Sequence, residues 1–480
     1  MYIGLDLGTS SLKGILTDRQ GNLIASASRE YPVEYPHPGW SQQDPAHWVR
    51  AMEEVLGELR SKADKIDALS VAGQMHGLVA LDGEGRVIRP CILWNDGRTA
   101  PQVAELNETV TKEGIAKYTG NAAFAGFTAP KVMWLRENEP ESYARIRKIM
   151  LPKDYLVYVL TGRYSAEYSD GAGTLLMDVE HRCWSEEMCR AAGVDMSWLP
   201  ELRESWETVG TALPQWGLGS CLVAAGAGDN AGAAVGTGAV NGGDCTVSLG
   251  TSGTVFISTD KFAQAGDGSA LHSFCHAEGR WHYLGCILSA ASANKWWLED
   301  ILGTKDYDGA VKGAEPGRTG VFFLPYLMGE RSPHNDTSAR GAFIGMTPAT
   351  TRQEMSLAVL EGVTFALRDC LEVARGLGVR LDSVTLCGGG ARSRLWRRLC
   401  ADIFRTRVRV PLVEQGPGYG AAILAMVTAG EYPTVEAACA AICRSELVAE
   451  PDEAMAARYD ALYARFRQLY PALKGIMSVD

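Results

Sequence analysis

The chain has 480 residues, of which 46% are hydrophobic and 21% charged, the usage of an ordinary globular protein long enough to bury a large core. Its formal net charge of -11 argues against nonspecific binding to nucleic acid or to an anionic membrane, since both need a basic surface. The charge does not exclude a small anionic ligand, because a few local backbone N–H groups can hold one.

The cysteines and the N-terminus bear on the compartment. The 12 cysteines are scattered without any Cys-x-x-Cys spacing, so we expect free thiols and no zinc site. No basic segment precedes an apolar run at the N-terminus, and no uncharged apolar stretch is long enough to cross a bilayer. The expectation is therefore a cytoplasmic protein without a signal peptide or membrane span.

An internal repeat is the first feature along the chain. Residues 4–18 read GLDLGTSSLKGILTD and residues 246–260 read TVSLGTSGTVFISTD, with seven identities at a constant offset of 242. In both copies two apolar runs flank a Gly-Thr-Ser turn, which predicts a β-hairpin. The repeat favours a duplicated architecture with two domains, residues 1–240 and 241–480.

Both hairpins are candidates for binding phosphate through turn amides and hydroxyls, although a plain hairpin turn is the structural alternative. Only the first copy adds a carboxylate, Asp6, which could hold magnesium; Ser248 takes its place in the second. The other candidates are Thr9, Ser10, Ser11 and Lys13 in the first copy and Gly250 and Thr251 in the second.

A helix and a strand follow the first hairpin. Asp44 and Pro45 suit the N-cap and first turn of a helix, and Trp48 and Met52 begin its apolar face. Residues 66–72 read as a strand that runs into Gly73-Gln74-Met75-His76-Gly77.

The residues after that strand could bind a polyol. The amide of Gln74 and the imidazole of His76 supply donors and acceptors, Met75 can shape a pocket, and Trp94 could lie against a sugar face. The alternatives remain a structural histidine and a tryptophan in the core.

A second candidate carboxylate ends a strand at residues 222–228. Asp229 and Asn230 open a run of very small residues, which lets a ligand or a neighbouring backbone come close. Asp229 is either a general base that takes a proton from an attacking hydroxyl or only the N-cap of the next helix.

The C-terminal half alternates strands and helices like the N-terminal half, so the predicted class is α/β. Thr351-x-x-Glu354 forms a capping box for one helix, and residues 384–387 form a strand before three glycines, 388–390. Such a loop could carry a flat base or ribose, but Walker A and Gly-x-Gly-x-x-Gly patterns are absent. The aromatic stripe Tyr459, Tyr463, Phe466 and Tyr470 predicts core packing.

With these residues in view, the sequence resembles the FGGY family of carbohydrate kinases over nearly its whole length. Gly126, Thr128, Lys131, Trp134, Glu137 and Asn138 match one family signature, and residues 388–402 match the other. The motifs that carry the resemblance are DLGTSSLKG (6–14), GQMHG (73–77), ILWNDGR (92–98), SDGAGT (169–174), GAGDNAGAAVGTG (226–238), SLGTSGTV (248–255), LPYLMGERSPHND (324–336), GGGARSRLW (388–396) and GPGYGAAILA (416–425).

The resemblance implies an actin-like fold, in which two ribonuclease-H-like domains enclose a cleft. It also implies ATP- and Mg²⁺-dependent phosphorylation of a ketopentose, with D-xylulose favoured because GQMHG is more typical of the members that act on it. The implied roles are catalytic base for Asp229; magnesium for Asp6 with Asp229; sugar for Gln74, Met75, His76, Trp94, Asp229 and Asn230; phosphate for Thr9, Ser10, Ser11, Lys13, Gly250 and Thr251; adenosine for Gly389, Gly390 and Arg394.

Two residues depart from the family pattern, and several alternatives stay open. Ser332 stands where threonine is usual, and Arg394 stands where proline or asparagine is common, which leaves the adenine contacts less defined. Another ketose or polyol, such as ribulose or fuculose, is the nearest alternative substrate. An actin-like ATPase without sugar chemistry and a sugar-responsive transcription regulator are alternatives of other classes. The expected partners are a ketose and ATP, without nucleic acid or membrane, and a homodimer is compatible with the sequence.

Overall fold

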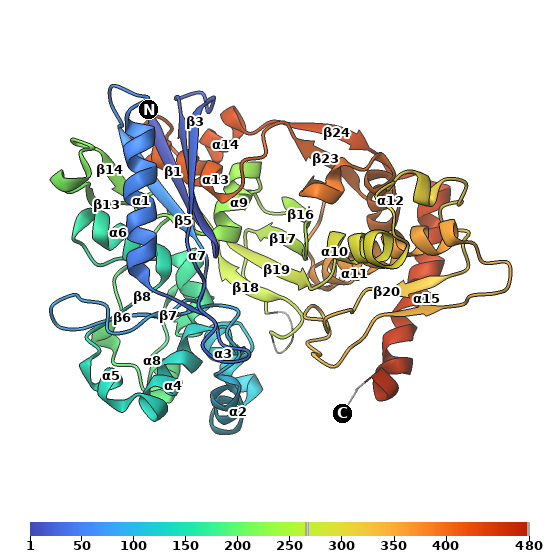
Figure 1. Ribbon diagram of the computed structural model, residues 1–480, viewed down its shortest axis with the longest axis horizontal. Helices are drawn as coiled ribbons and strands as arrows, with labels where there is room; N and C mark the ends of the chain where they lie inside the picture. The colour runs from blue at the N-terminus through green and yellow to red at the C-terminus, as the bar shows by residue number, and fades with distance from the viewer. Residues whose placement is uncertain (265, 267, 478–480) are drawn as a thin grey trace.

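Two mixed β-sheets, one from each half of the chain, form the frame of the protein (Figure 1). The structure is a computed structural model that describes residues 1–264, 266 and 268–477. The first sheet contains, in order across it, β13 (Thr208–Thr211), β14 (Leu222–Ala224), β5 (Ala68–Gly73), β1 (Tyr2–Leu7), β2 (Ser11–Thr17) and β3 (Leu23–Glu30), with β15 (Ala227–Gly228) also beside β5.

The second sheet repeats the pairing of the first. Each sheet contains three antiparallel strands, which are β3-β2-β1 in the first and β19 (Trp281–Ile287), β17 (Gly253–Thr259) and β16 (Cys245–Leu249) in the second, followed by two parallel neighbours and then an antiparallel strand. The second sheet has one further antiparallel strand at its edge, β18 (His272–Cys275), beside β19. The predicted duplication and its two hairpins are therefore confirmed. The second sheet contains, in order, β18 (His272–Cys275), β19 (Trp281–Ile287), β17 (Gly253–Thr259), β16 (Cys245–Leu249), β22 (Ser383–Cys387), β23 (Arg407–Pro411) and β24 (Ser445–Ala449).

Helices cover the faces of both sheets and fill an insertion between β5 and β13 (Figure 1). Those of the N-terminal half are α1 (Pro45–Arg60), α2 (Ala100–Thr109), α3 (Lys112–Thr119), α4 (Thr128–Asn138), α5 (Pro140–Arg145), α6 (Pro152–Thr161), α7 (Tyr168–Gly171), α8 (Glu186–Ala192) and α9 (Asp229–Thr237). Those of the C-terminal half are α10 (Ala291–Lys295), α11 (Arg352–Gly376), α12 (Arg394–Phe404), α13 (Pro417–Thr428), α14 (Val435–Ile442) and α15 (Glu453–Met477).

Short strands complete the architecture at the edges of these elements. They are β4 (Gln42–Gln43), β6 (Val79–Leu81), β7 (Cys91–Ile92), β8 (Lys148–Met150), β9 (Ala166–Glu167), β10 (Met177–Asp178), β11 (Cys183–Trp184), β12 (Leu202–Arg203), β20 (Phe322–Leu324) and β21 (Ala342–Ile344). Among the described helices, none is long and apolar enough to cross a bilayer.

Local sequence signals placed several elements correctly. The Asp44 carboxylate caps α1 by accepting the Ala46 N–H, and Thr351 and Glu354 form the predicted capping box of α11. The strand predicted at 66–72 begins two residues later, as β5. The aromatic stripe on α15 is buried, as predicted, and belongs to the core of the C-terminal half.

The strand predicted at 222–228 is interrupted, and this break places Asp229. Gly226 adopts a positive φ of 87°, and a Cβ there would lie 2.1 Å from the Val71 carbonyl oxygen. The strand therefore splits into β14 and β15, and α9 starts immediately after β15. The N-cap of α9 is Gly228, so the alternative in which Asp229 serves only as the N-cap is wrong.

Helices α9 and α13 meet through glycines. A Cβ on Gly420 would lie 1.8 Å from the Gly232 carbonyl oxygen, which explains the small residues of α9 as a close approach of two backbones. Helix α13 also packs on β1 and β5, so the chain returns from its C-terminal half to the first sheet (Figure 1). The division at residue 240 stays a prediction.

Candidate active site

The turn of the first hairpin is tied to the loops that follow β5 and β7. The Thr9 hydroxyl donates to Gln74 Oε1 at 3.3 Å and accepts from Trp94 Nε1 at 3.0 Å. Gln74 is buried, and its Nε2 donates to Gln43, so its amide is occupied by protein partners. Ser10 is exposed at the tip of the turn and Ser11 partly exposed beside it.

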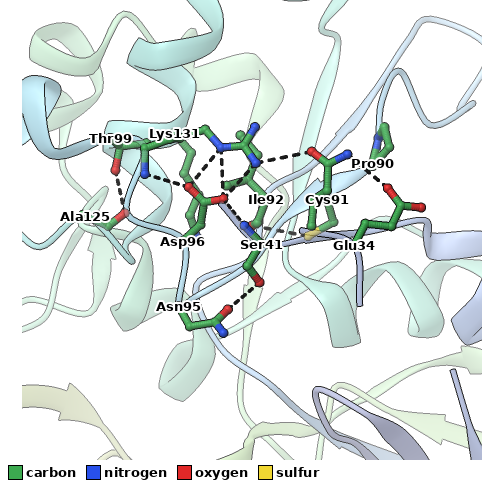
Figure 2. A network of polar contacts seen from close by, with 12 residues as sticks. Glu34, Ser41, Pro90, Cys91, Ile92, Asn95, Asp96, Thr99, Ala125 and Lys131 are labelled. Carbon is green, nitrogen blue, oxygen red and sulfur yellow. Dashed lines mark hydrogen bonds and ion pairs between the residues drawn. The ribbon is translucent and has the colours of Figure 1, made fainter. Parts of the chain in front are cut away.

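Trp94 is 42% exposed, so the alternative that placed it in the core is wrong. A network of polar contacts fixes its loop (Figure 2). The Asp96 carboxylate accepts from the Ser41 N–H at 2.5 Å and from the guanidinium of Arg98, and the Ser41 hydroxyl donates to Asn95. Because the side chains of Asp96 and Arg98 are fully buried, this ion pair is a rigid base for the exposed indole.

His76 is held by backbone and side-chain bonds in a constrained conformation. It adopts a positive φ of 68°, and its carbonyl oxygen accepts from Lys131 Nζ at 2.7 Å and Thr128 Oγ1 at 3.1 Å. Its Nδ1 lies 2.6 Å from the Gly173 carbonyl oxygen, which can only accept, so Nδ1 carries a proton. Burial lowers the pKa of His76 to about 3, so the ring is neutral and Nε2 is left as an acceptor.

Asp229 is linked to the loop that contains His76 through Asn230 and Met75. Its Oδ1 accepts from the Asn230 N–H at 2.7 Å and from Asn230 Nδ2 at 2.9 Å, and the same Nδ2 lies 3.8 Å from the sulfur of Met75. Burial raises the pKa of Asp229 to about 6, with the bonds from Asn230 acting in the opposite direction. A carboxylate in this range can accept a proton near neutral pH.

Asp6 is a second carboxylate near Asp229. Burial, and then repulsion from Asp229, raise the pKa of Asp6 to about 7, while the charge of Lys13 opposes the shift. Lys13 stands opposite Asp6 in the β1–β2 pairing, and its ammonium donates to Gln415 Oε1 at 3.0 Å. The first hairpin is therefore linked to the loop that precedes α13.

A cavity of about 270 Å³ joins these residues to the second hairpin. Asp229 and Asn230 line it from α9, and Ser248 and Thr254 line it from β16 and β17. Gln415, the partner of Lys13, lines it from the loop before α13. The cavity thus brings the predicted base together with the second hairpin, across the meeting point of the two halves.

A larger cavity of about 670 Å³ is lined in part by the turn of the second hairpin. The predicted residues Thr251, Gly389 and Gly390 line it, together with Trp396. Gly250 precedes Thr251 in the hairpin turn. Arg394 is exposed and is not among the described residues that line this cavity, whereas Arg392 and Ser393 are.

Comparison with known proteins assigns this site to a family. Residues 1–236 match the N-terminal domain of the FGGY family of carbohydrate kinases, and residues 245–429 match its C-terminal domain. The chain belongs to the FGGY family of carbohydrate kinases. A relative named xylulose kinase, from Escherichia coli strain K12, is 42% identical, with all of both chains covered.

Solved structures of FGGY kinases resemble the whole chain. A kinase from Brucella ovis, described as a xyloylose kinase, has 41% identity and a TM-score of 0.94, with 99% of each chain covered. A gluconate kinase from Lactobacillus acidophilus has 25% identity and the same TM-score of 0.94, with 98% of each chain covered. The α/β fold of actin-like type is therefore confirmed, but kinases for different sugars share it.

Several residues at the FGGY site were not predicted individually from the sequence. Ser248, Thr254 and Gln415 line the smaller cavity, and Gly173 accepts the bond from His76. Gly173 and Gln415 lie in or beside motifs that carried the family resemblance. Their hydrogen bonds, however, join residues far apart in the chain, which no local pattern records.

Proposed function

We propose that this protein transfers the γ-phosphoryl group of ATP to O5 of D-xylulose, giving D-xylulose 5-phosphate and ADP. Membership of the FGGY family supports a carbohydrate kinase, and the xylulose kinase named above, identical at 42% over its full length, supports the sugar. The GQMHG motif at 73–77 points to the same substrate.

One observation carries the proposal most directly. Asp229 lines a cavity that also contains residues of the second hairpin, and its neighbour Asn230 contacts Met75. A base in this position can face a sugar on the side of residues 74–76 and a phosphate on the side of the hairpins. A sugar hydroxyl bound there would lie between the carboxylate of Asp229 and the phosphate that it attacks.

In the proposed mechanism Asp229 accepts the proton of the O5 hydroxyl as that oxygen attacks the γ-phosphorus. The O5–P bond forms, the bond between the γ-phosphorus and the β,γ-bridging oxygen breaks, and ADP leaves with those electrons. Turn amides of the two hairpins, at Thr9, Ser10, Ser11, Gly250 and Thr251, would stabilise the charge that spreads over the transferred group. Closure of the cleft would exclude water as a competing acceptor.

The residues present fit a magnesium ion. Asp6 and Asp229 are two partly exposed carboxylates with raised pKa values, and the pKa of Asp6 is raised partly by the charge of Asp229, a repulsion that a divalent cation would relieve. Among the described residues, no cluster of three or more acidic, histidine or cysteine side chains could hold a metal. The ion would be held by one or two carboxylates and the substrate phosphates, where it would neutralise phosphate charge.

The sugar would lie against Met75, His76, Trp94 and Asn230, with His76 Nε2 accepting a hydroxyl. Gln74 would act through Thr9, since its amide is occupied. The adenosine would occupy the larger cavity near Gly389 and Gly390, with Arg394 outside it. We also propose a cytoplasmic location.

A panel of ketoses and polyols with ATP and Mg²⁺, read by coupled ADP release, tests the substrate. We expect kcat/KM for D-xylulose to exceed that for ribulose, fuculose, glycerol and gluconate. A higher value for ribulose or fuculose would replace the substrate within the family. ADP release that ignores every sugar, together with polymer formation, would favour an actin-like ATPase.

A further inference from the structure

A buried segment behind the site holds both His76 and the residue before Asp229. The segment consists of β9, α7 and the 3-10 turn Ala172–Thr174. Its Gly173 carbonyl oxygen accepts a hydrogen bond from His76 Nδ1 at 2.6 Å. Its Ser169 hydroxyl accepts the Gly228 N–H at 3.1 Å, across 59 positions of sequence. One element therefore supports the groups on both sides of the proposed reaction.

The hydrogen bond from Gly228 to Ser169 has a defined direction and is buried away from solvent. Ser169 is fully buried, and its hydroxyl donates to Glu167 Oε2 at 2.6 Å. Since the only hydroxyl proton points at Glu167, the lone pairs of Ser169 are left for the Gly228 N–H. A carboxylate acceptor also polarises the hydroxyl, which strengthens the second bond in the chain.

The strand break before Asp229 is held from a second direction. The ammonium of Lys153 donates to the Ala225 carbonyl oxygen at 3.2 Å and is paired with Asp154. Gly226, between the two strand fragments, has the positive φ described above and donates to the Ser205 carbonyl oxygen at 3.0 Å. These bonds fix the start of the break, at Ala225 and Gly226. The hydrogen bond from Gly228 to Ser169 fixes its end.

We propose that Ser169 is a positioning residue for Asp229, acting through the N–H of Gly228. This inference rests on the proposed function, in which Asp229 accepts the sugar proton. Gly228 is the residue directly before Asp229 and the N-cap of α9, so a shift of its peptide moves the carboxylate. Displacement of a reacting group by about 1 Å can cost about 100-fold in rate.

The chain offers a matched control in Ser205. Its hydroxyl is also buried and donates to the same carboxylate, at Glu167 Oε1 and 2.7 Å, but it receives no bond from Gly228. Ser169→Ala and Ser205→Ala therefore each remove one bond to Glu167, and only the first leaves the Gly228 N–H without its acceptor.

The experiment measures kcat, both KM values and the melting temperature of the full chain for the two variants. We expect Ser169→Ala to lower kcat by about 10- to 100-fold with both KM values within about threefold, because binding is retained and only the geometry is lost. Ser205→Ala should keep kcat within about twofold at a similar loss of melting temperature. Equal kcat losses in both variants, or an unchanged kcat in Ser169→Ala, would overturn the inference.

Two additions keep the result decisive. If Ser169→Ala does not fold, Ser169→Cys and Ser205→Cys replace the pair with a thiol, a weaker acceptor, and the same difference in kcat is expected. Asp229→Asn is measured in parallel. If it abolishes turnover while the Ser169 variants keep normal kcat, the positioning inference alone is wrong. If Asp229→Asn itself turns over normally, the proposed base is wrong.

Discussion

Lys131 and His76 are joined by a hydrogen bond of 2.7 Å from the Lys131 ammonium to the His76 carbonyl oxygen. Lys131 is fully buried and donates also to the Gly126 carbonyl oxygen, and no acidic side chain of the described residues pairs with it. A non-glycine residue with positive φ costs free energy that its surroundings must offset. Lys131 supplies that offset at the residue proposed to contact the sugar.

Lys131→Met should therefore raise the KM for the sugar by up to about tenfold, because loss of two buried hydrogen bonds costs about 0.5–1.5 kcal/mol each, shared between stability and site geometry. The KM for ATP should change little. Lys148→Met is the matched control, because Lys148 also donates to a backbone carbonyl, that of Ser197, but at the surface. Steady-state kinetics with both substrates varied checks this, and equal KM changes in the two variants would refute it.

His76→Asn tests the proposed sugar contact itself. Asparagine tolerates the positive φ of this position better than most residues, so the backbone should persist. Loss of the Nε2 acceptor should raise the KM for the sugar by up to about tenfold, the equivalent of about one hydrogen bond. His181→Asn, at an exposed histidine, should leave it unchanged. An unaltered sugar KM in His76→Asn would remove His76 from the sugar site.

Sequence reasoning found the elements whose signals are local. Helix α1 follows from its cap, α11 from its capping box, and the two hairpins from the repeat. It also found Asp229 and Asn230, which now line the cavity between the halves. In each case the residues that decide the structure are neighbours in the chain.

What the sequence did not reveal depends on residues far apart. The return of α13 to the first sheet follows from packing of glycines that are 188 positions apart, Gly232 and Gly420. The split of the strand at Gly226 depends on the Val71 backbone, and the contact of Trp94 with Thr9 joins residues 85 positions apart. Periodicity records which face of an element is apolar, but not which partner covers it.

The close approach of α9 and α13 predicts the effect of one methyl group. Gly420→Ala would place a Cβ 1.8 Å from the Gly232 carbonyl oxygen, so the helices must separate. We expect destabilisation of about 1–3 kcal/mol and lower activity. Gly57→Ala in α1, where a Cβ would meet nothing within 4 Å, should instead stabilise by about 0.5–1 kcal/mol. Denaturant unfolding measures both, and a neutral Gly420→Ala would contradict this packing.

The raised pKa of Asp229 predicts an acid limb in kcat. A carboxylate with a pKa of about 6 loses its basic form at a higher pH than an ordinary aspartate, so kcat should fall as pH drops below about 6. His76 stays neutral and adds no inflection in this range. A kcat constant from pH 8 to pH 5 at saturating substrates would exclude the assignment.

The kcat of Asp229→Asn, with sugar affinity measured on the same sample, decides whether Asp229 is the base. We expect sugar binding to be retained and kcat to fall by about 10²–10⁴-fold, the usual effect of a lost general base. Asp244→Asn, at a partly buried carboxylate that accepts from the Val240 and Asn241 N–H groups outside the smaller cavity, should stay within a few-fold of the unaltered protein. Turnover of Asp229→Asn within a few-fold of the unaltered protein would contradict the account.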